Sequence, residues 1–253
     1  MVIPINLPAS ENETQQGQAF RSVLAAVVSE LTSLLALDVS RLEAITVAAN
    51  IDSALAQFDD GGIETGRTLT RTRGEGVAAG ITPVCMRAGS ARCHIFFPAS
   101  QVAPLSATLM STNEQRSIAR YVVAHELSHV HDLAQRARHL EPHVLKTPGD
   151  LLTPPLFWQL AEICWNEYVA CRLSACTYPE VLRDFSELLI QPLHAFRPSV
   201  RATLLKCIAQ GTSAPAFEGG VESLYPILNI RAMPWDISMD WAHRPFPRRS
   251  KMH

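Results

Sequence analysis

The 253-residue chain has no hydrophobic run that approaches the roughly 18 uninterrupted apolar residues of a membrane span. Its N-terminus lacks the basic and apolar segments of a secretory signal. Neither sign of charge dominates: 22 Lys and Arg stand against 24 Asp and Glu, and the formal net charge of −2 gives no long-range attraction to nucleic acid. We therefore expect a cytoplasmic protein that binds neither membrane nor nucleic acid.

Cysteine is also scarce, with six residues in the chain and no C-x-x-C pair. This density is too low for a disulfide scaffold, so most of the cysteines are expected to be reduced core residues. Cys85 and Cys93 flank a turn-like segment and could face each other across a hairpin, which leaves an oxidised pair as an alternative.

The chain shows no internal repeat and no low-complexity tract, and hydrophobic spacing predicts an α+β fold. Ser111 and Glu114 fit a capping box at the start of one helix, and Pro154 and Pro155 suit the first turn of the next. The predicted elements are a helix over 13–37, a strand over 41–48, a short helix over 51–58, hairpin strands over 77–86 and 92–97, and helices over 111–140 and 153–175.

We predict one domain over 1–243. Its core spans about 40–178 and consists of a small antiparallel sheet packed on a pair of helices. Additional N- and C-terminal helices cover 13–37 and 178–230, and 244–253 is expected to be a loose basic tail.

An H-E-x-x-H motif lies inside the predicted helix over 111–140, at His125, Glu126 and His129. On a helix with 3.6 residues per turn, the two histidines stand one turn apart on one face, so both imidazoles can bind one metal ion. Glu126 points to the side of that pair, where it can accept a proton from a zinc-bound water. Burying these three polar side chains in an apolar helix without a partner would cost several kcal/mol, which favours a bound metal over a coincidental motif.

Catalytic zinc usually has three protein ligands, so a third must come from elsewhere. Glu167 is the best candidate, because on a helical wheel it lies in the middle of an apolar stripe, where a carboxylate needs a partner. Glu162 lies nearly opposite on the same helix and is expected to be a surface or salt-bridged residue. Weaker candidates are His131, Asp132, His139 and His143; Asp132 could instead orient the ring of His129 or simply be exposed.

The H-E-L-S-H sequence at 125–129 and the E-Y-V-A-C-R-L sequence at 167–173 together resemble the gluzincin pattern of HtpX-like, IrrE-like and minigluzincin peptidases. In those families Asp or Asn usually stands where this chain has Cys171. The resemblance covers about two helices. It implies zinc bound by His125, His129 and Glu167, with Glu126 as the catalytic base, and a sheet whose edge strand receives a peptide substrate.

The sequence therefore predicts a zinc metallopeptidase that hydrolyses peptide bonds. We expect the peptide or protein substrate to bind along the strand over 92–97, with the other hairpin strand as the alternative edge. An oxyanion donor could be His143, Tyr168 or Tyr178. Two other classes stay open: a catalytically silent, zinc-stabilised binding protein of the same fold, and a nucleic-acid-binding regulator, which the balanced charge disfavours.

Overall fold

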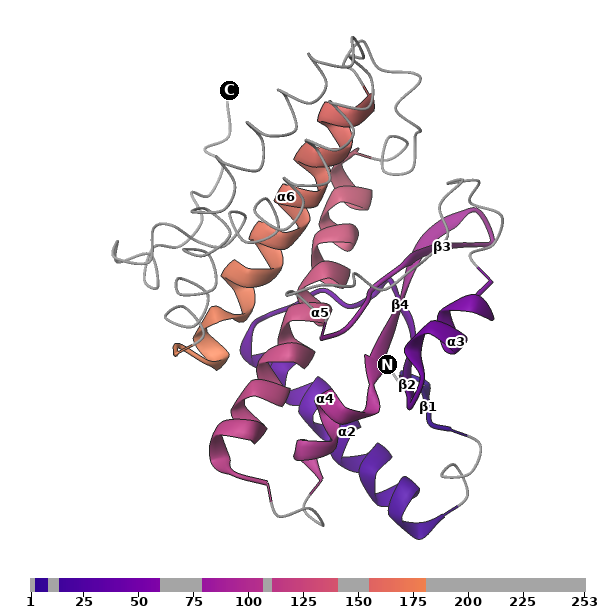
Figure 1. Cartoon of the computed structure of the whole chain (residues 1–253). Coiled ribbons are helices and arrows are strands. Elements are labelled where there is room, and N and C mark those ends of the chain that lie inside the picture. The colour runs from indigo at the N-terminus through magenta and orange to yellow at the C-terminus, as the bar shows by residue number, and fades with distance from the viewer. Residues whose placement is uncertain (1–2, 9–13, 60–78, 107–110, 141–154, 181–253) are drawn as a thin grey trace, which may run out of the picture.

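The computed structural model describes residues 3–8, 14–59, 79–106, 111–140 and 155–180 (Figure 1). These residues form an α+β fold with a small mixed sheet of four strands and several helices. In chain order the elements are β1 (Ile5–Asn6), α2 (Gln15–Leu34), β2 (Leu42–Ala48), α3 (Ile51–Ala56), β3 (Val84–Arg87), β4 (Ser90–Pro98), α4 (Ala99–Val102), η1 (Ala103–Leu105), α5 (Asn113–Leu140), α6 (Pro155–Ser174) and η3 (Ala175–Thr177).

The strand order in the sheet is β1-β2-β4-β3. β1 and β4 both run parallel to β2, and β3 and β4 form an antiparallel hairpin. The prediction of an antiparallel sheet is therefore right for the hairpin and wrong for the sheet as a whole. β2 and its parallel neighbour β4 are not consecutive in the chain, since α3 and β3 come between them. Parallel strands need such a longer connection, whereas a hairpin does not. β1 was not predicted, because a strand of two residues carries no periodic pattern.

The strand over 92–97 lies inside the sheet, because β4 is paired on both sides. β2 forms hydrogen bonds with one side of β4. β3 pairs with the other side, and this pairing extends before β3 to a bridge between Ile81 and Phe96. The expectation that this strand forms an edge of the sheet, open to a peptide substrate, is wrong, since its main-chain groups already have partners. Among the described residues, β3 is the outer strand of the hairpin.

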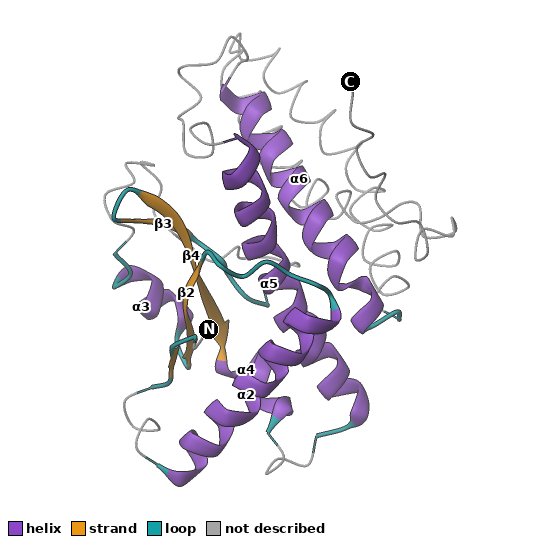
Figure 2. Cartoon of the chain, turned by 180° about the vertical axis from the view of Figure 1, so that it is seen from behind, coloured by secondary structure: helices purple, strands orange, loops and turns teal. Residues whose placement is uncertain are grey.

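The two faces of the sheet are covered by different helices (Figure 2). The main core forms where α2 and α5 pack against one face, and its fully buried side chains include Leu31, Ile45, Phe97 and Leu127. On the other face, α3 covers Phe96. The predicted first long helix is present as α2, and its buried apolar residues, which include Leu24 and Val28, anchor it in the main core.

The hairpin turns at Ala88 and Gly89, which both have positive φ angles of 48° and 76°. Two such residues in succession suit the right-handed twist of a two-residue hairpin turn. The register pairs Val84 with Cys93 and Cys85 with Arg92, so the two cysteine side chains project to opposite faces of the hairpin. Both cysteines are free thiols, and the alternative of an oxidised pair is wrong.

The N-terminus of α5 is capped one residue later than the sequence suggested. The Gln115 amide donates to Thr112 Oγ1 at 3.1 Å, and the Thr112 amide donates to Gln115 Oε1 at 2.9 Å. This reciprocal pair is a capping box, so the assignment to Ser111 and Glu114 is wrong. The two overlapping four-residue windows have the same pattern, and only the position of the first helical turn distinguishes them.

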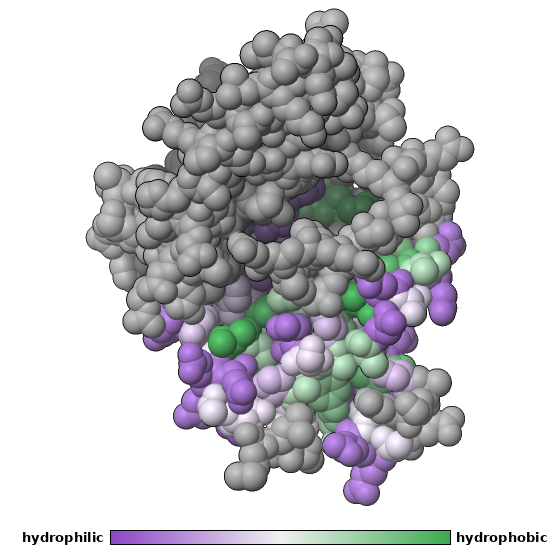
Figure 3. All heavy atoms as spheres, in the orientation of Figure 1, coloured by the Kyte–Doolittle hydropathy of each residue, from purple (hydrophilic) through white to green (hydrophobic). Residues whose placement is uncertain are grey.

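Helix α6 begins at Pro155, as its fixed φ angle favours. The predicted helices beyond residue 180 and the predicted tail over 244–253 lie outside the described residues. Within the described ranges, no helix combines the length and hydrophobicity needed to span a membrane. In the described part of the face shown in Figure 3, hydrophobic and hydrophilic residues are interspersed.

Candidate metal centre

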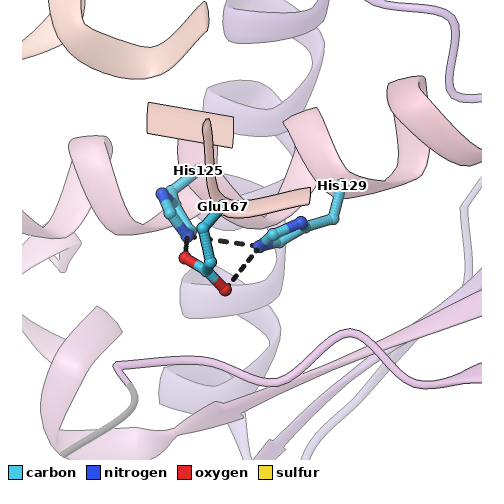
Figure 4. A group of neighbouring side chains, drawn as sticks. All are labelled: His125, His129 and Glu167. Atoms are coloured by element: carbon cyan, nitrogen blue, oxygen red, sulfur yellow. Dashed lines mark hydrogen bonds and ion pairs between the residues drawn. The ribbon is translucent and has the colours of Figure 1, made fainter. Parts of the chain in front are cut away.

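Two long helices bring the motif residues together. α5 and α6 lie side by side, with α5 between α6 and the sheet (Figures 1 and 2). His125 and His129 stand one turn apart on α5, and Glu167 reaches toward them from α6 (Figure 4). Their side chains are partly accessible, with 17%, 16% and 28% of their surface exposed. The group is therefore partly buried rather than fully enclosed.

The polar atoms of these three side chains converge. The Nε2 atoms of His125 and His129 lie 3.2 Å apart, and their rings stand at 85° to each other. Glu167 places Oε2 3.5 Å from Nε2 of His125 and Oε1 3.9 Å from Nε2 of His129. Among the described residues, this is the group of His, Cys, Asp and Glu side chains close enough to hold one metal ion. We call it the metal cluster.

The separations suit a tetrahedral metal ion. Bonds of about 2.0 to 2.2 Å from a tetrahedral centre place neighbouring ligand atoms about 3.3 to 3.6 Å apart. The observed distances of 3.2, 3.5 and 3.9 Å surround that range. The donor set of two imidazoles and one carboxylate also leaves a fourth position for water or substrate. The metal cluster could therefore hold a metal ion without a change in the backbone.

The electrostatics of the metal cluster suit a cation. Burial opposes ionisation of Glu167, but the hydrogen bond from His125 and the charges of both histidines outweigh it and lower the pKa of Glu167 to about 2. Burial lowers the pKa of His129. Burial also opposes a charge on His125, but its bonds to Cys171 and Glu167 outweigh it and raise the pKa of His125 well above the usual value. The cluster thus offers an ionised carboxylate and a neutral imidazole, with one proton on His125 that a metal would displace.

The far side of the His125 ring is held by α6 as well. Cys171 Sγ lies 3.9 Å from Nδ1 of His125, and the Tyr121 hydroxyl donates to the same sulfur at 4.0 Å. Cys171 is the residue that stands where the resembled families carry Asp or Asn, and its thiol lies where an outer hydrogen-bond acceptor belongs. A contact at Nδ1 favours the tautomer in which Nε2 is free for the metal.

Glu126 is only 5% exposed, and its carboxylate faces the chain segment that precedes β3. The Thr82 hydroxyl donates to its Oε2 at 2.6 Å. Gly80 lies so close that an added Cβ would stand 2.6 Å from Cγ of Glu126 and 2.8 Å from Oε1. The chain segment before β3 therefore forms one wall around this carboxylate. This wall could not be predicted from the sequence, because Thr82 and Glu126 are 44 residues apart and no motif includes Thr82.

A second polar cluster joins α5 to α6 beside the metal cluster. Asp132 is 5% exposed; Trp165 Nε1 donates to its Oδ1 at 3.0 Å, and the Arg136 guanidinium lies 2.7 Å from its Oδ2. Arg136 also reaches Glu162 at 3.1 Å and Asn166 at 2.9 Å. We call these five residues the helix clamp. The prediction of a salt-bridged Glu162 is confirmed, while the expectation that Asp132 is exposed or supports His129 is wrong.

The remaining candidates have other partners. His131 accepts a hydrogen bond from the Asp38 amide through Nδ1 at 2.8 Å, and His139 is exposed at the end of α5. Tyr168 accepts from Arg172 at 3.2 Å, and the buried Tyr178 packs near Tyr121. None of these three contacts involves the metal cluster. His143 lies outside the described residues.

Comparisons of the whole chain with protein families, with curated proteins and with solved structures find no match. Assignment of a function therefore rests on the chemistry of the metal cluster and Glu126.

Proposed function

We propose that this chain is a gluzincin-type, zinc-dependent peptidase in which His125, His129 and Glu167 bind the metal and Glu126 is the general base. One observation carries the proposal. A carboxylate from α6 meets the two Nε2 atoms of α5 at distances that suit a tetrahedral ion, and a separate carboxylate, Glu126, follows the first of these histidines in the chain.

The donor set alone leaves the choice of metal open, because two histidines and one carboxylate bind non-haem iron(II) as well as zinc. Glu126 favours zinc. Oxygen activation by iron has no need of a neighbouring base, whereas hydrolysis needs a group that removes a proton from water. Metal analysis of the purified chain separates the two, with about one zinc per chain as the expected result.

The chain's own residues divide the work of hydrolysis. When bound, zinc would polarise the scissile carbonyl and lower the pKa of water toward about 7. Glu126 accepts the proton of the attacking water and later delivers it to the leaving amine. Glu167 and the two histidines keep their positions because α5 and α6 are locked together by the helix clamp.

For the substrate, we propose that an extended peptide pairs with the outer edge of β3. β4 cannot accept another strand, because β2 and β3 pair with its two sides. β3 pairs with β4 on one side only, so its other side is the edge of the hairpin that a peptide could join. Main-chain hydrogen bonds to such an edge hold a peptide while being indifferent to its side chains. The residues that lead into β3 are also those that contact Glu126, so a peptide on this edge would lie near the base.

The test is Glu126→Gln. The amide has nearly the same shape but cannot take a proton, so hydrolysis should fall by about 10² to 10⁴-fold while zinc content stays at one per chain. The assay counts new amino termini formed from a mixture of synthetic decapeptides. Glu114→Gln is the matched control, because it makes the same change at an exposed position of α5 and should leave hydrolysis unaltered.

Two results would contradict the proposal. Equal hydrolysis by wild-type chain and Glu126→Gln would exclude Glu126 as the base. A wild-type chain that binds zinc stoichiometrically and cleaves no peptide would instead indicate a zinc-stabilised binding protein.

A further inference from the structure

We infer that Thr82 and Gly80 are positioning residues for Glu126: together they hold its carboxylate in one orientation for proton transfer. This inference rests on the proposed function, since it assigns a purpose to a contact that the metal cluster does not explain. The contact joins α5 to the segment before β3, across 44 residues of sequence.

The segment is fixed to the sheet at its centre. Ile81 exchanges two main-chain hydrogen bonds with Phe96 of β4, at 2.9 and 2.8 Å, and its side chain packs against the cluster under α3. In extended chain, neighbouring residues face opposite sides. Since Ile81 faces α3, Gly80 and Thr82 on either side of it face Glu126. The bridge to β4 therefore sets the position of both.

The two residues restrain Glu126 in different ways. Thr82 supplies a donor to Oε2, and among the described residues it is the hydrogen-bond donor that reaches this carboxylate. Gly80 supplies space, because any Cβ would stand within 3.0 Å of Cγ, Cδ and Oε1 of Glu126. One oxygen is thereby engaged, and the other has no hydrogen-bond partner among the described residues. A buried carboxylate with one oxygen held and one open is suited to accepting a proton in a defined direction.

The first experiment tests the contact without any reference to catalysis. The full-length chain, at equal metal content, is unfolded with urea as wild type, Thr82→Val, Glu126→Met and the double variant. Thr82→Val removes the hydroxyl and keeps the shape, and Glu126→Met removes the acceptor and keeps an unbranched chain. Thr82→Val should raise the unfolding equilibrium constant about tenfold or more, but by less than about twofold in the Glu126→Met background.

The second experiment tests the purpose of the contact by the same decapeptide assay. Thr82→Val should lower kcat about tenfold at unchanged KM and zinc content, and Thr82→Ser, which restores a hydroxyl, should recover most of that loss. Gly80→Ala should lower kcat too, because its methyl group pushes the Glu126 side chain from its place. Thr46→Val is the matched control. It removes a hydroxyl that is hydrogen-bonded to His94 at 2.8 Å rather than to Glu126.

The outcomes separate this inference from the proposed function. Hydrolysis that does not respond to Thr82→Val, or that increases, would overturn the positioning role and leave the function standing. Absence of coupling between Thr82 and Glu126 in the urea experiment would overturn the contact itself. A third outcome combines coupling in the urea experiment with a wild-type chain that cleaves no peptide. It would overturn the proposed function, and with it the catalytic purpose of the contact.

Discussion

The metal cluster and the helix clamp both join α5 to α6, yet they differ in how their carboxylates are balanced. In the clamp, the Arg136 guanidinium lies against Asp132 and Glu162. The Trp165 indole N–H also donates to Asp132. In the metal cluster, Glu167 meets two imidazoles and no permanent cation. Buried charges are costly unless they are paired. The clamp contains a permanent cation, whereas the charge of Glu167 is balanced by a proton on His125 that a metal ion would displace.

The largest expected effect is the loss of metal when a member of the metal cluster is removed. Glu167→Ala deletes one of three protein ligands and should weaken zinc binding by about 10³-fold or more, since each ligand contributes a large share of the binding free energy. The measurement is zinc content after dialysis, followed by titration with a zinc-competing chelator.

Glu162→Ala is the matched control for that variant, because it removes a carboxylate from the same helix but from the clamp. It should keep one zinc per chain. Equal zinc content in the two variants would mean that the difference between the clusters has no bearing on metal binding.

The second prediction concerns the clamp, where a substitution should lower stability and leave zinc binding unchanged. Asp132→Ala leaves the Arg136 guanidinium, which is 19% exposed, without its closest partner. Removal of one partner from a buried ion pair typically costs several kcal/mol, and Glu162 still neutralises part of the charge, so we expect the free energy of unfolding to fall by about 2 to 3 kcal/mol. Urea unfolding measures this change. Asp132→Ala should keep its zinc at one per chain, and a loss of zinc at unchanged stability would make Asp132 part of the metal cluster.

The contacts of these two clusters could be predicted from the sequence only in part. The spacing of His125 and His129 and the apolar surroundings of Glu167 on a helical wheel were enough to predict that the three meet, because a helix fixes side-chain directions from local sequence alone. The same reasoning predicted Glu162 to be a surface or salt-bridged residue, and its ion pair with Arg136 agrees. The indole partner of Asp132 was missed, since Trp165 comes into place only once the two helices have packed. Arg136 lies one turn further along α5, so its ion pair with Asp132 could have been predicted from the i,i+4 spacing and was not.

The sheet resisted prediction for a related reason. The period of alternation finds a strand but carries no information about its neighbours, so β4 could not be placed in the middle of the sheet from its sequence. β2 pairs with β4 across a crossover, and β1 is too short to have a pattern. The wall formed by Gly80 and Thr82 beside Glu126 depends on that strand order. The meeting of His125, His129 and Glu167 was therefore predictable, and the surroundings of Glu126 were not.

The third prediction concerns the outer contact to His125. Cys171→Ala removes the sulfur that lies 3.9 Å from Nδ1, so the ring loses a group that holds its orientation. Outer partners of metal-binding histidines typically contribute 10- to 100-fold in affinity, and the thiol is a weak acceptor, so we expect about a tenfold loss. Zinc affinity is measured by chelator competition. Cys176→Ala, at an exposed position, is the control and should show no change; an equal loss in both would exclude a specific role for Cys171.

The smallest expected effect concerns a carboxylate outside α5 and α6. It tests whether a carboxylate paired with an arginine stabilises the fold there too, as Asp132 is expected to do in the clamp. Glu43 of β2 accepts from Arg87 Nε at 2.7 Å and from the Cys85 thiol at 3.1 Å. Burial opposes its ionisation, but the hydrogen bonds from Arg87 and Cys85 outweigh burial and lower the pKa of Glu43.

An acid whose pKa is lowered on folding adds stability above its unfolded pKa of about 4.5, and this contribution is lost as the pH falls through the folded value. Glu43 is 33% exposed, so solvent screening limits the contribution to about 0.5 to 1 kcal/mol. Glu43→Gln should therefore lower the free energy of unfolding by that amount at pH 7, and the difference from wild type should shrink as the pH falls below about 4. Urea unfolding at a series of pH values measures it, with zinc content expected to stay unchanged. A difference that stays constant down to pH 3 would show that the charge of Glu43 contributes nothing, and that an arginine partner does not by itself mark a stabilising carboxylate.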